Sequence, residues 1–242
     1  MSDPFVTAVS IEGVASALAG SRNGIDAVLR DRGLRRSGPE HTARSLLLGA
    51  AASATLEGDP VEADDLARGG GGTTARAALR LSSELLGLIP TWERVPLQAI
   101  ARLHALAAAG SVPDADLGRP SSPEGVSRLA ELAGLLTRST EAPALAVAAL
   151  VHAEILVTEA FGSHNGVVAR AAERLVLVSR GVDPVSVIVP EAGHAASPDA
   201  YVRAVSAYAT GSPSGLHTWM LYAADAYTRG AEASPLVSSP GR

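Results

Sequence analysis

Apolar residues recur at helical spacing along most of the chain, and no stretch alternates long enough at a period of two to form a sheet. We therefore expect an all-α fold. Gly, Pro and Asp separate the stretches of periodic apolar residues and mark the boundaries of the predicted helices. These helices cover residues 14–36, 42–56, 63–67, 73–88, 97–109, 124–138, 143–159, 166–180, 200–210 and 216–230.

The segments between these helices suggest how the chain is organised. Residues 110–123 are rich in Gly, Pro, Ser and Asp, which predicts an exposed flap with room for a small β-hairpin. Residues 1–40 form a predicted N-terminal helical extension, and residues 41–230 form the main domain. The Ser/Pro/Gly-rich residues 231–242 are predicted to be a disordered tail.

Composition narrows the class of protein. Hydrophobic residues make up 47% of the 242 residues but aromatic residues only 3%, so the core must consist mainly of Ala, Leu and Val. The absence of cysteine excludes disulfides, thiolate catalysis and Cys-ligated metals. A net charge of −5 without a basic cluster argues against nucleic acid as a partner. The abundance of Ala, Gly, Arg and Pro is typical of a GC-rich bacterial genome.

Neither the N-terminus nor the apolar runs resemble a targeting segment. The start "MSDPFVTAVSIEG" has no basic region followed by an apolar one, so we expect no signal peptide. The longest uncharged apolar run, "APALAVAALV", ends at His152 and is too short to span a bilayer. The expected location is therefore cytoplasmic, without membrane contact.

The stretch "EAFGSHNGVVAR", residues 159–170, joins two apolar helices through a short loop and carries the candidate chemistry. The first N–H groups of the second helix have no intrahelical acceptor, and with the helix dipole they favour an anion. Gly166 would let a phosphate approach the backbone closely. Arg170, one turn later, could reach back over the same place. Together with Asn165, these residues predict a phosphate-binding site.

This stretch resembles the motif HxFx(D/E)GNGRxxR of the Fic family, helical enzymes that typically transfer AMP from ATP to a protein hydroxyl. The similarity extends in order and spacing over about residues 42–230. The motif positions fall, in order, on Glu159, Phe161, Ser163, His164, Asn165, Gly166, Val167 and Arg170. Upstream, "SATLEG" fits the pattern (S/T)xxxE(G/N) of the N-terminally inhibited Fic class, and it places the inhibitory residues at Ser53, Glu57 and Gly58.

The match is degenerate where Fic chemistry takes place. Glu159 stands where the family has its general-base histidine, and a carboxylate with an ordinary pKa near ~4 is a weaker base than imidazole. Ser163 replaces the carboxylate that holds Mg²⁺, and Val167 removes an arginine from the phosphates. His164, at a family glycine, could donate to a phosphate, act as a base or be an exposed loop residue.

The other histidines suggest no metal site. His152, in an apolar helix, is expected to be a hydrogen-bonded core residue, and Phe161 is expected to be buried where that helix ends. No metal-ligand spacing links the remaining histidines, which are His41, His104, His194 and His217.

Three hypotheses follow from the degenerate motif. The first is a pseudoenzyme without ordinary AMPylation that binds a nucleotide or another phosphate ligand in a regulatory role. The second is an active nucleotidyl- or phospho-group transferase that uses Glu159 or His164 as its base. The third is a helical interaction module with a closed pocket.

The resemblance also implies cofactors and partners. ATP and Mg²⁺ are the candidate cofactors. A protein target docked at the flap is a candidate partner, and a second copy of the chain in a homodimer is another. It further predicts that Glu57 pairs with Arg170, with Ser53 close by on the same helix.

Overall fold

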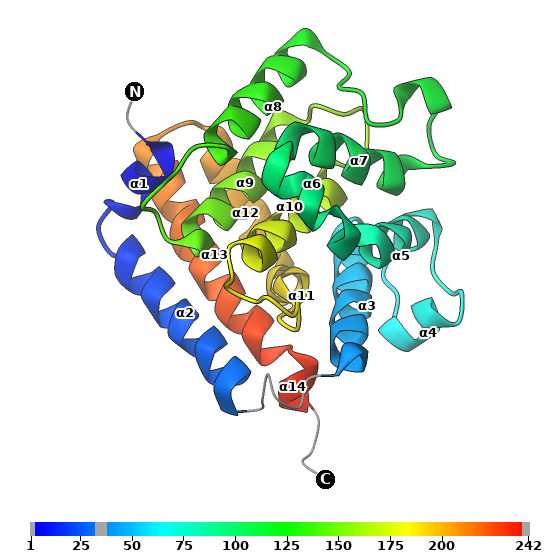
Figure 1. Cartoon of the computed structure of the whole chain (residues 1–242), viewed down its shortest axis with the longest axis horizontal. Coiled ribbons are helices and arrows are strands. Elements are labelled where there is room, and N and C mark those ends of the chain that lie inside the picture. Colours follow the sequence, from blue (N-terminus) through cyan, green and yellow to red (C-terminus); the bar gives the residue numbers. More distant parts are fainter. Residues whose placement is uncertain (1–2, 32–37, 239–242) are drawn as a thin grey trace.

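The computed structural model describes residues 3–31 and 38–238, and these residues fold almost entirely into helices (Figure 1). Two short 3₁₀ segments, η1 (Leu85–Leu88) and η2 (Asp114–Asp116), interrupt the α-helices. The α-helices are α1 (Pro4–Val9), α2 (Val14–Asp31), α3 (Pro39–Leu56), α4 (Ala63–Ala67), α5 (Thr73–Glu84), α6 (Ile89–Arg94), α7 (Pro96–Ala108), α8 (Pro123–Leu136), α9 (Ala144–Thr158), α10 (Asn165–Ser179), α11 (Pro190–Ala195), α12 (Pro198–Ala209), α13 (Pro213–Glu232) and α14 (Pro235–Ser238).

The centre of the fold is the pair α9 and α10, which pack against each other more extensively than any other two helices. Nine of the ten residues 144–153 are buried, and all nine except His152 are apolar, so α9 is apolar on every face there. A helix that is apolar all round is stable only when it is surrounded by other helices. Accordingly, helices α1, α2, α8, α12 and α13 contact α9, while α3, α5, α6, α7 and α11 contact α10.

The N-terminal helices belong to the same hydrophobic core as the rest of the chain. Helix α2 lies along α13 over its length (Figure 1), and α1 contacts α9 and α13. Phe5, Leu18 and Ile25 are buried in the common cluster. The predicted helix from residue 14 is thus confirmed up to Asp31, and residues 32–36 of that prediction lie outside the described residues.

The flap segment does not form the expected hairpin. Among the described residues its β pairing consists of one isolated bridge between Ala109 and Val112, followed by η2. Pro113 and Pro120 have no N–H to donate to a ladder, and Gly118 adopts a positive φ of 71°. A chain interrupted in this way folds into turns and cannot sustain two paired strands.

The C-terminal tail is more structured than its composition predicts. Helix α13 extends to Glu232 and α14 follows, so the expected disorder from residue 231 is wrong up to Ser238. The reason is apolar anchoring, because Leu236 is buried in the core and α14 contacts α3. Residues 239–242 lie outside the described residues.

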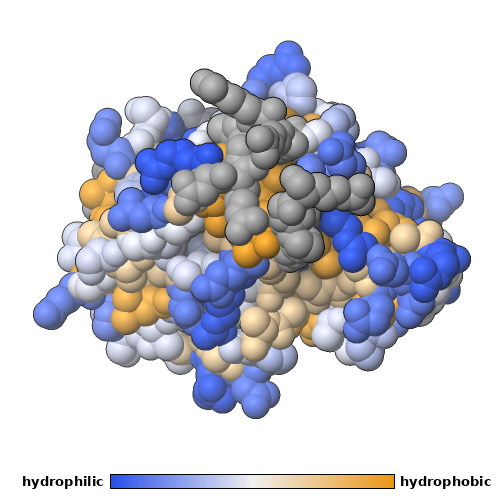
Figure 2. Space-filling view, turned by 90° about the horizontal axis from the view of Figure 1, so that it is seen from below, coloured by the Kyte–Doolittle hydropathy of each residue, from blue (hydrophilic) through white to orange (hydrophobic). Residues whose placement is uncertain are grey.

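The surface carries no extended apolar face in the view of Figure 2, where hydrophobic residues occur in small groups separated by hydrophilic ones. The large hydrophobic side chains that are exposed among the described residues come from five helices and the link between α6 and α7, and are Val6, Val95, Leu97, Val126, Val202 and Val237. Among the helices in the described part of the chain, none has the length and apolar character needed to cross a bilayer.

Candidate functional site

The loop between α9 and α10 is closed by the side chain of Asn165. Its Oδ1 accepts from the backbone N–H of Phe161 at 3.1 Å, and its Nδ2 donates to the carbonyl of Phe161 at 2.7 Å. Phe161 is buried, as predicted, and anchors the loop to the core. Asn165 was predicted to bind phosphate, but in the structure both ends of its amide are used to hold the loop.

His164 begins α10 in a left-handed conformation, with φ of 59°. This is the position where the Fic motif has glycine, the residue that adopts this conformation without a steric penalty. Its Nδ1 lies 2.8 Å from Oγ of Ser163, so the two side chains that differ most from the motif bind each other. Burial lowers the pKa of His164, with a smaller opposing effect from Glu57, which favours a neutral imidazole at this position.

Arg170 is fully enclosed and its guanidinium is clasped by α3. Its Nη2 donates to Oε1 of Glu57 at 2.6 Å, its Nε donates to Oγ of Ser53 at 2.8 Å, and its Nη2 also lies 3.2 Å from the Ser53 carbonyl. The arginine side chain is 1% exposed and that of Glu57 is 30% exposed. The predicted contact between Glu57 and Arg170, with Ser53 beside it, is confirmed.

The carboxylate of Glu57 also covers the N-terminus of α10. A Cβ atom placed on Gly166 would lie 2.1 Å from Oε1 of Glu57 and 3.2 Å from Nη1 of Arg170. Gly58, with φ of 82°, ends α3 directly after Glu57 in the conformation typical of a helix C-terminus. The place where sequence analysis predicts an anion is therefore filled by an anion that the chain itself supplies.

The residues of the predicted catalytic set do not converge on this site. Glu159 is exposed in a left-handed conformation at the end of α9, and no hydrogen bond to its carboxylate is found within the described residues. Val167 is buried and lines, together with Ser82, Leu85 and Arg170, a void of only about 10 Å³. Position 167 faces the core, so an arginine there could not point at a ligand without repacking.

The loop also fits Mg²⁺ poorly. The motif's acidic position offers only the Ser163 hydroxyl, which is bound to His164. Mg²⁺ is usually held by one or two carboxylates together with substrate phosphates. The nearby carboxylate, Glu57, is already paired with Arg170.

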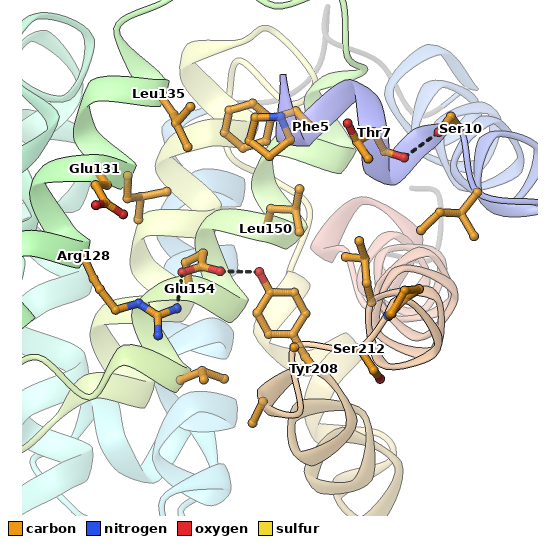
Figure 3. A pocket seen from close by; sticks show the side chains of 18 residues that line it. Phe5, Thr7, Ser10, Arg128, Glu131, Leu135, Leu150, Glu154, Tyr208 and Ser212 are labelled. Carbon is orange, nitrogen blue, oxygen red and sulfur yellow. Dashed lines mark hydrogen bonds and ion pairs between the residues drawn. The ribbon is translucent and has the colours of Figure 1, made fainter. Parts of the chain in front are cut away.

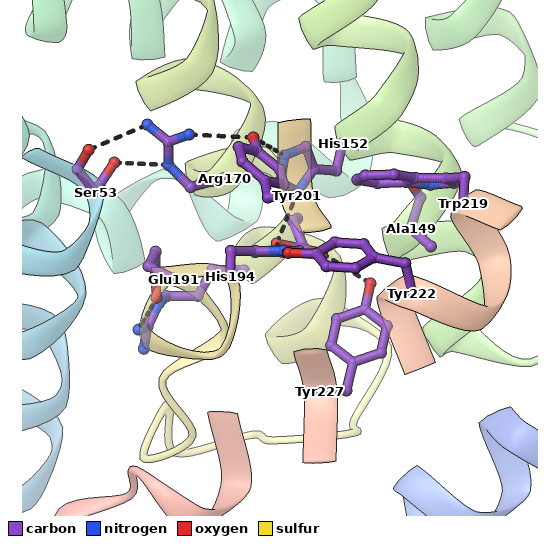
Figure 4. A network of polar contacts seen from close by, with 12 residues as sticks. Ser53, Ala149, His152, Arg170, Glu191, His194, Tyr201, Trp219, Tyr222 and Tyr227 are labelled. Atoms are coloured by element: carbon purple, nitrogen blue, oxygen red, sulfur yellow. Dashed lines mark hydrogen bonds and ion pairs between the residues drawn. The ribbon is translucent and has the colours of Figure 1, made fainter. Parts of the chain in front are cut away.

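Behind Arg170, a chain of buried hydrogen bonds runs into the core (Figure 4). Nη1 of Arg170 donates to the hydroxyl of Tyr201 at 3.2 Å, and this hydroxyl lies 2.8 Å from Nε2 of His152. Nδ1 of His152 lies 3.0 Å from Oε2 of Glu173. Because a carboxylate only accepts, His152 donates through Nδ1, and its Nε2 is left to accept from Tyr201. Every donor in the chain thus points towards Glu173.

Glu173 is the buried centre of this network. His194 Nε2 lies 3.0 Å from its Oε2, and the Tyr227 hydroxyl donates to its Oε1 at 2.8 Å. Nδ1 of His194 in turn contacts the hydroxyl of Tyr222 at 3.1 Å. Burial alone would raise the pKa of Glu173, but its contacts with His152 and His194, whose imidazoles donate to the carboxylate, outweigh burial and hold the pKa well below its usual range.

His152 and Tyr201 titrate outside the neutral range. Burial lowers the pKa of His152 to about 4, against a smaller opposing effect of Glu173. Burial likewise raises the pKa of Tyr201 to about 12. Both groups are therefore neutral at pH 7, which is the protonation state that the hydrogen-bond directions require.

The same cluster contains a possible metal-ligand set that sequence spacing did not suggest. One ligand atom each of His152, Glu173 and His194 lies within 4.8 Å of the other two. In this structure each of these atoms is satisfied by another member of the cluster. The prediction that His152 is a hydrogen-bonded core histidine is confirmed. Glu173 was not predicted from the sequence, although a carboxylate on a mostly apolar helix was a visible signal.

A second buried ion pair lies one turn further along α10. Arg174 donates from Nε and Nη2 to the two carboxylate oxygens of Glu191 on α11, at 2.9 and 2.5 Å. Its Nη1 donates to the hydroxyls of Ser45 and Ser186, both at 3.0 Å. Gly49 on α3 faces this pair, and a Cβ there would lie 2.7 Å from Nη2 of Arg174. This pair was not predicted from the sequence.

The end of the flap segment lies against the loop, as expected. The backbone N–H and the hydroxyl of Ser121 both donate to the carbonyl of Ala160, at 2.7 and 3.1 Å. His104 of α7 stacks on Phe161 with a centroid distance of 4.1 Å, and its Nδ1 accepts from the N–H of Gly118. The segment is thus tied to the loop at its C-terminal end.

Comparison with solved structures shows which fold this arrangement belongs to. A fragment of Fic-1 from C. elegans matches with a TM-score of 0.71 at 13% identity, covering 95% of this chain and 72% of that one. A Fic family protein from Desulfovibrio desulfuricans G20 gives 0.71 at 16% identity, covering 91% and 74%. A glutamate-to-glycine variant of the C. elegans fragment gives 0.69 at 15% identity, covering 95% and 72%.

The chain therefore has the all-α fold of Fic proteins. No protein-family model and no curated protein matches the sequence. Identities of 13–16% leave the activity to be argued from the site itself.

Proposed function

We propose that this Fic-fold chain is a pseudoenzyme with a regulated anion site, which binds a phosphate-bearing ligand such as a nucleotide but does not transfer AMP. The main support for this proposal is that the carboxylate of Glu57 lies against Gly166 and pairs with Arg170. A carboxylate that is bound by a guanidinium and lies beside the first turn of a helix occupies a position that suits a phosphate. Displacing Glu57 would leave both groups available for a ligand.

The lack of AMP transfer is inferred from the residues of the loop. Transfer to a hydroxyl needs a base near the reacting atoms and stabilisation of the phosphates. Glu159 is exposed at the base position, Ser163 replaces the metal ligand and Val167 is turned into the core. The loss of the base, the metal ligand and one arginine from the same motif favours ligand binding over catalysis.

Calorimetry with ATP, with and without Mg²⁺, tests the binding proposal on the wild type and on Glu57→Gly. We expect binding at least tenfold tighter in Glu57→Gly and nearly independent of Mg²⁺, because the metal ligand is missing. Glu57→Gly with Arg170→Ala serves as the matched control and should lose this gain. A folded Glu57→Gly variant that does not bind ATP would contradict the proposal and support the closed interaction module.

Intact-mass analysis after incubation with ATP and Mg²⁺ tests the catalytic part. We expect no added nucleotidyl mass on the chain itself or on a partner protein. An added mass would support the active-transferase hypothesis, and Glu159→Gln and His164→Ala would then identify the base.

A further inference from the structure

A second cavity lies on the other side of α9, away from the loop and from α10. It has a volume of about 780 Å³ and is enclosed by α1, α8, α9 and the turn from α12 into α13 (Figure 3). No residue of the α9–α10 loop or of α10 lines it. The cavity is therefore separate from the anion site, and its size is typical of sites for small molecules, about 300–1,000 Å³.

Most of the cavity wall is apolar. It is formed by aliphatic and aromatic side chains from four helices, namely Phe5, Leu132, Leu135, Leu150, Val157 and Leu216. Phe5 is fixed at this place because Asp3 caps α1, with Oδ1 accepting from the N–H of Phe5 at 2.9 Å. Such a surface favours the apolar body of a ligand.

The charged groups are gathered on one side of the cavity. Glu154 accepts from Nη2 of Arg128 at 2.9 Å and from the hydroxyl of Tyr208 at 2.5 Å. Burial, reinforced by Glu154, raises the pKa of Tyr208, so the phenol remains a neutral donor. Figure 3 shows Arg128, Glu131 and Glu154 along one side, with Leu135 next to Glu131 and with Phe5 and Thr7 towards the other side.

The positive and negative charges on this side of the cavity do not cancel. Arg128 neutralises Glu154, and Glu131, one turn after Arg128 on α8, contributes a second carboxylate. The three charged residues that line the cavity thus sum to one negative charge, and the hydroxyl of Tyr208 is bound to Glu154. An anionic head group next to Arg128 would be repelled by two carboxylates, whereas a cationic head group would be attracted by them and could also contact the aromatic ring.

We infer that this cavity binds a small organic cation, an apolar body carrying one protonated amine. The body lies between α1, α9 and α13, and the ammonium lies near Glu131 and Glu154. The site is independent of the proposed anion site, and ATP is not expected to compete for it.

Three probes with the same body but different heads test this inference by calorimetry at pH 7: 4-phenylbutylamine, 4-phenylbutanol and 4-phenylbutanoate. We expect the amine to bind at least tenfold more tightly than the other two. Equal affinities, tighter binding of the carboxylate, or no binding of the amine at millimolar concentration would each overturn the inference.

Two variants and one control test whether the amine binds in this cavity. Glu131→Gln removes an exposed charge without disturbing the Arg128–Glu154 pair, and we expect at least a threefold loss of amine affinity with little change for the alcohol. Leu135→Trp fills the cavity and should abolish amine binding. Glu93→Gln, at an exposed position on α6, should leave the affinity unchanged. Unchanged affinity in Glu131→Gln or in a folded Leu135→Trp, or an equal loss in Glu93→Gln, would contradict this location.

Discussion

Oε1 of Glu57 lies so close to Gly166 that a Cβ atom at this position would be only 2.1 Å from it. The same oxygen accepts from Arg170 at 2.6 Å. One carboxylate thus closes the N-terminus of α10 and neutralises a guanidinium that is otherwise enclosed. This double role makes Glu57 important for both stability and ligand access.

Glu57→Gly should lower the stability of the chain by about 2 kcal/mol, between the values for an exposed and a buried ion pair, because Arg170 is left buried without its carboxylate. Glu57→Gln keeps an acceptor and should cost less. Urea unfolding followed by circular dichroism gives both values. A Glu57→Gly variant as stable as the wild type would show that the clasp does not stabilise the fold.

Gly166→Ala should weaken the clasp, because the new methyl group occupies the position of the Glu57 carboxylate. Glu57 is a flexible side chain and can move away, so we expect a loss of about 1 kcal/mol rather than unfolding. Gly134→Ala is the matched control, since it also lies in a helix but nothing lies within 4 Å of a Cβ there. Replacing a helical glycine without a clash should stabilise by up to ~1 kcal/mol. Equal effects of the two substitutions would contradict the predicted clash.

Tyr201→Phe should destabilise more than Tyr222→Phe. Removing the hydroxyl of Tyr201 leaves Nη1 of Arg170 and Nε2 of His152 without their hydrogen-bond partner, whereas the hydroxyl of Tyr222 bonds to His194. An unsatisfied buried polar group costs about 1–3 kcal/mol. Thermal unfolding of the two variants compares them directly, and a larger effect at Tyr222 would mean that the relay to Arg170 adds little.

Stability should fall as the pH decreases from about 6.5 to about 4. The pKa of His152 is lowered to about 4 in the folded chain, so between these values the unfolded chain binds a proton that the folded chain does not. Above the unfolded pKa this destabilisation is absent, and below pH 4 it reaches its full size, on the order of 3 kcal/mol. His152→Gln should show a smaller decrease in this window. An identical pH profile for both proteins would assign the effect to other groups.

The helical fold was predictable from sequence wherever a helix is long and periodic. The all-apolar stretch of α9 and the stop after Leu56 at Gly58 left little choice of structure. Helices α1, α6, α11 and α14 were not predicted, and each has only four to six residues. Short helices of this kind are stabilised by packing and not by their own periodicity.

The candidate site was predictable only in part. Glu57 and Arg170 could be paired in advance because both belong to recognisable motifs. The network around Glu173 could not, since its members come from α9, α10, α11, α12 and α13, and their spacing in sequence says nothing about where these helices cross. The role of the Asn165 amide in holding the loop was also not predicted, because it depends on a contact with the backbone of Phe161.

The two arginines of α10, Arg170 and Arg174, restrict how this helix can be aligned with its neighbours. Apart from these charged residues, α10 presents mostly Ala, Val and Leu to its neighbours, and such small apolar surfaces can pack in several registers with similar energies. Arg170 reaches a carboxylate on α3 and Arg174 reaches one on α11. Sliding α10 by one turn would separate both pairs at once and leave buried charges unmatched. Arg170 therefore specifies the register of the helix bundle, which is reason enough for its presence even in a chain that never meets a nucleotide.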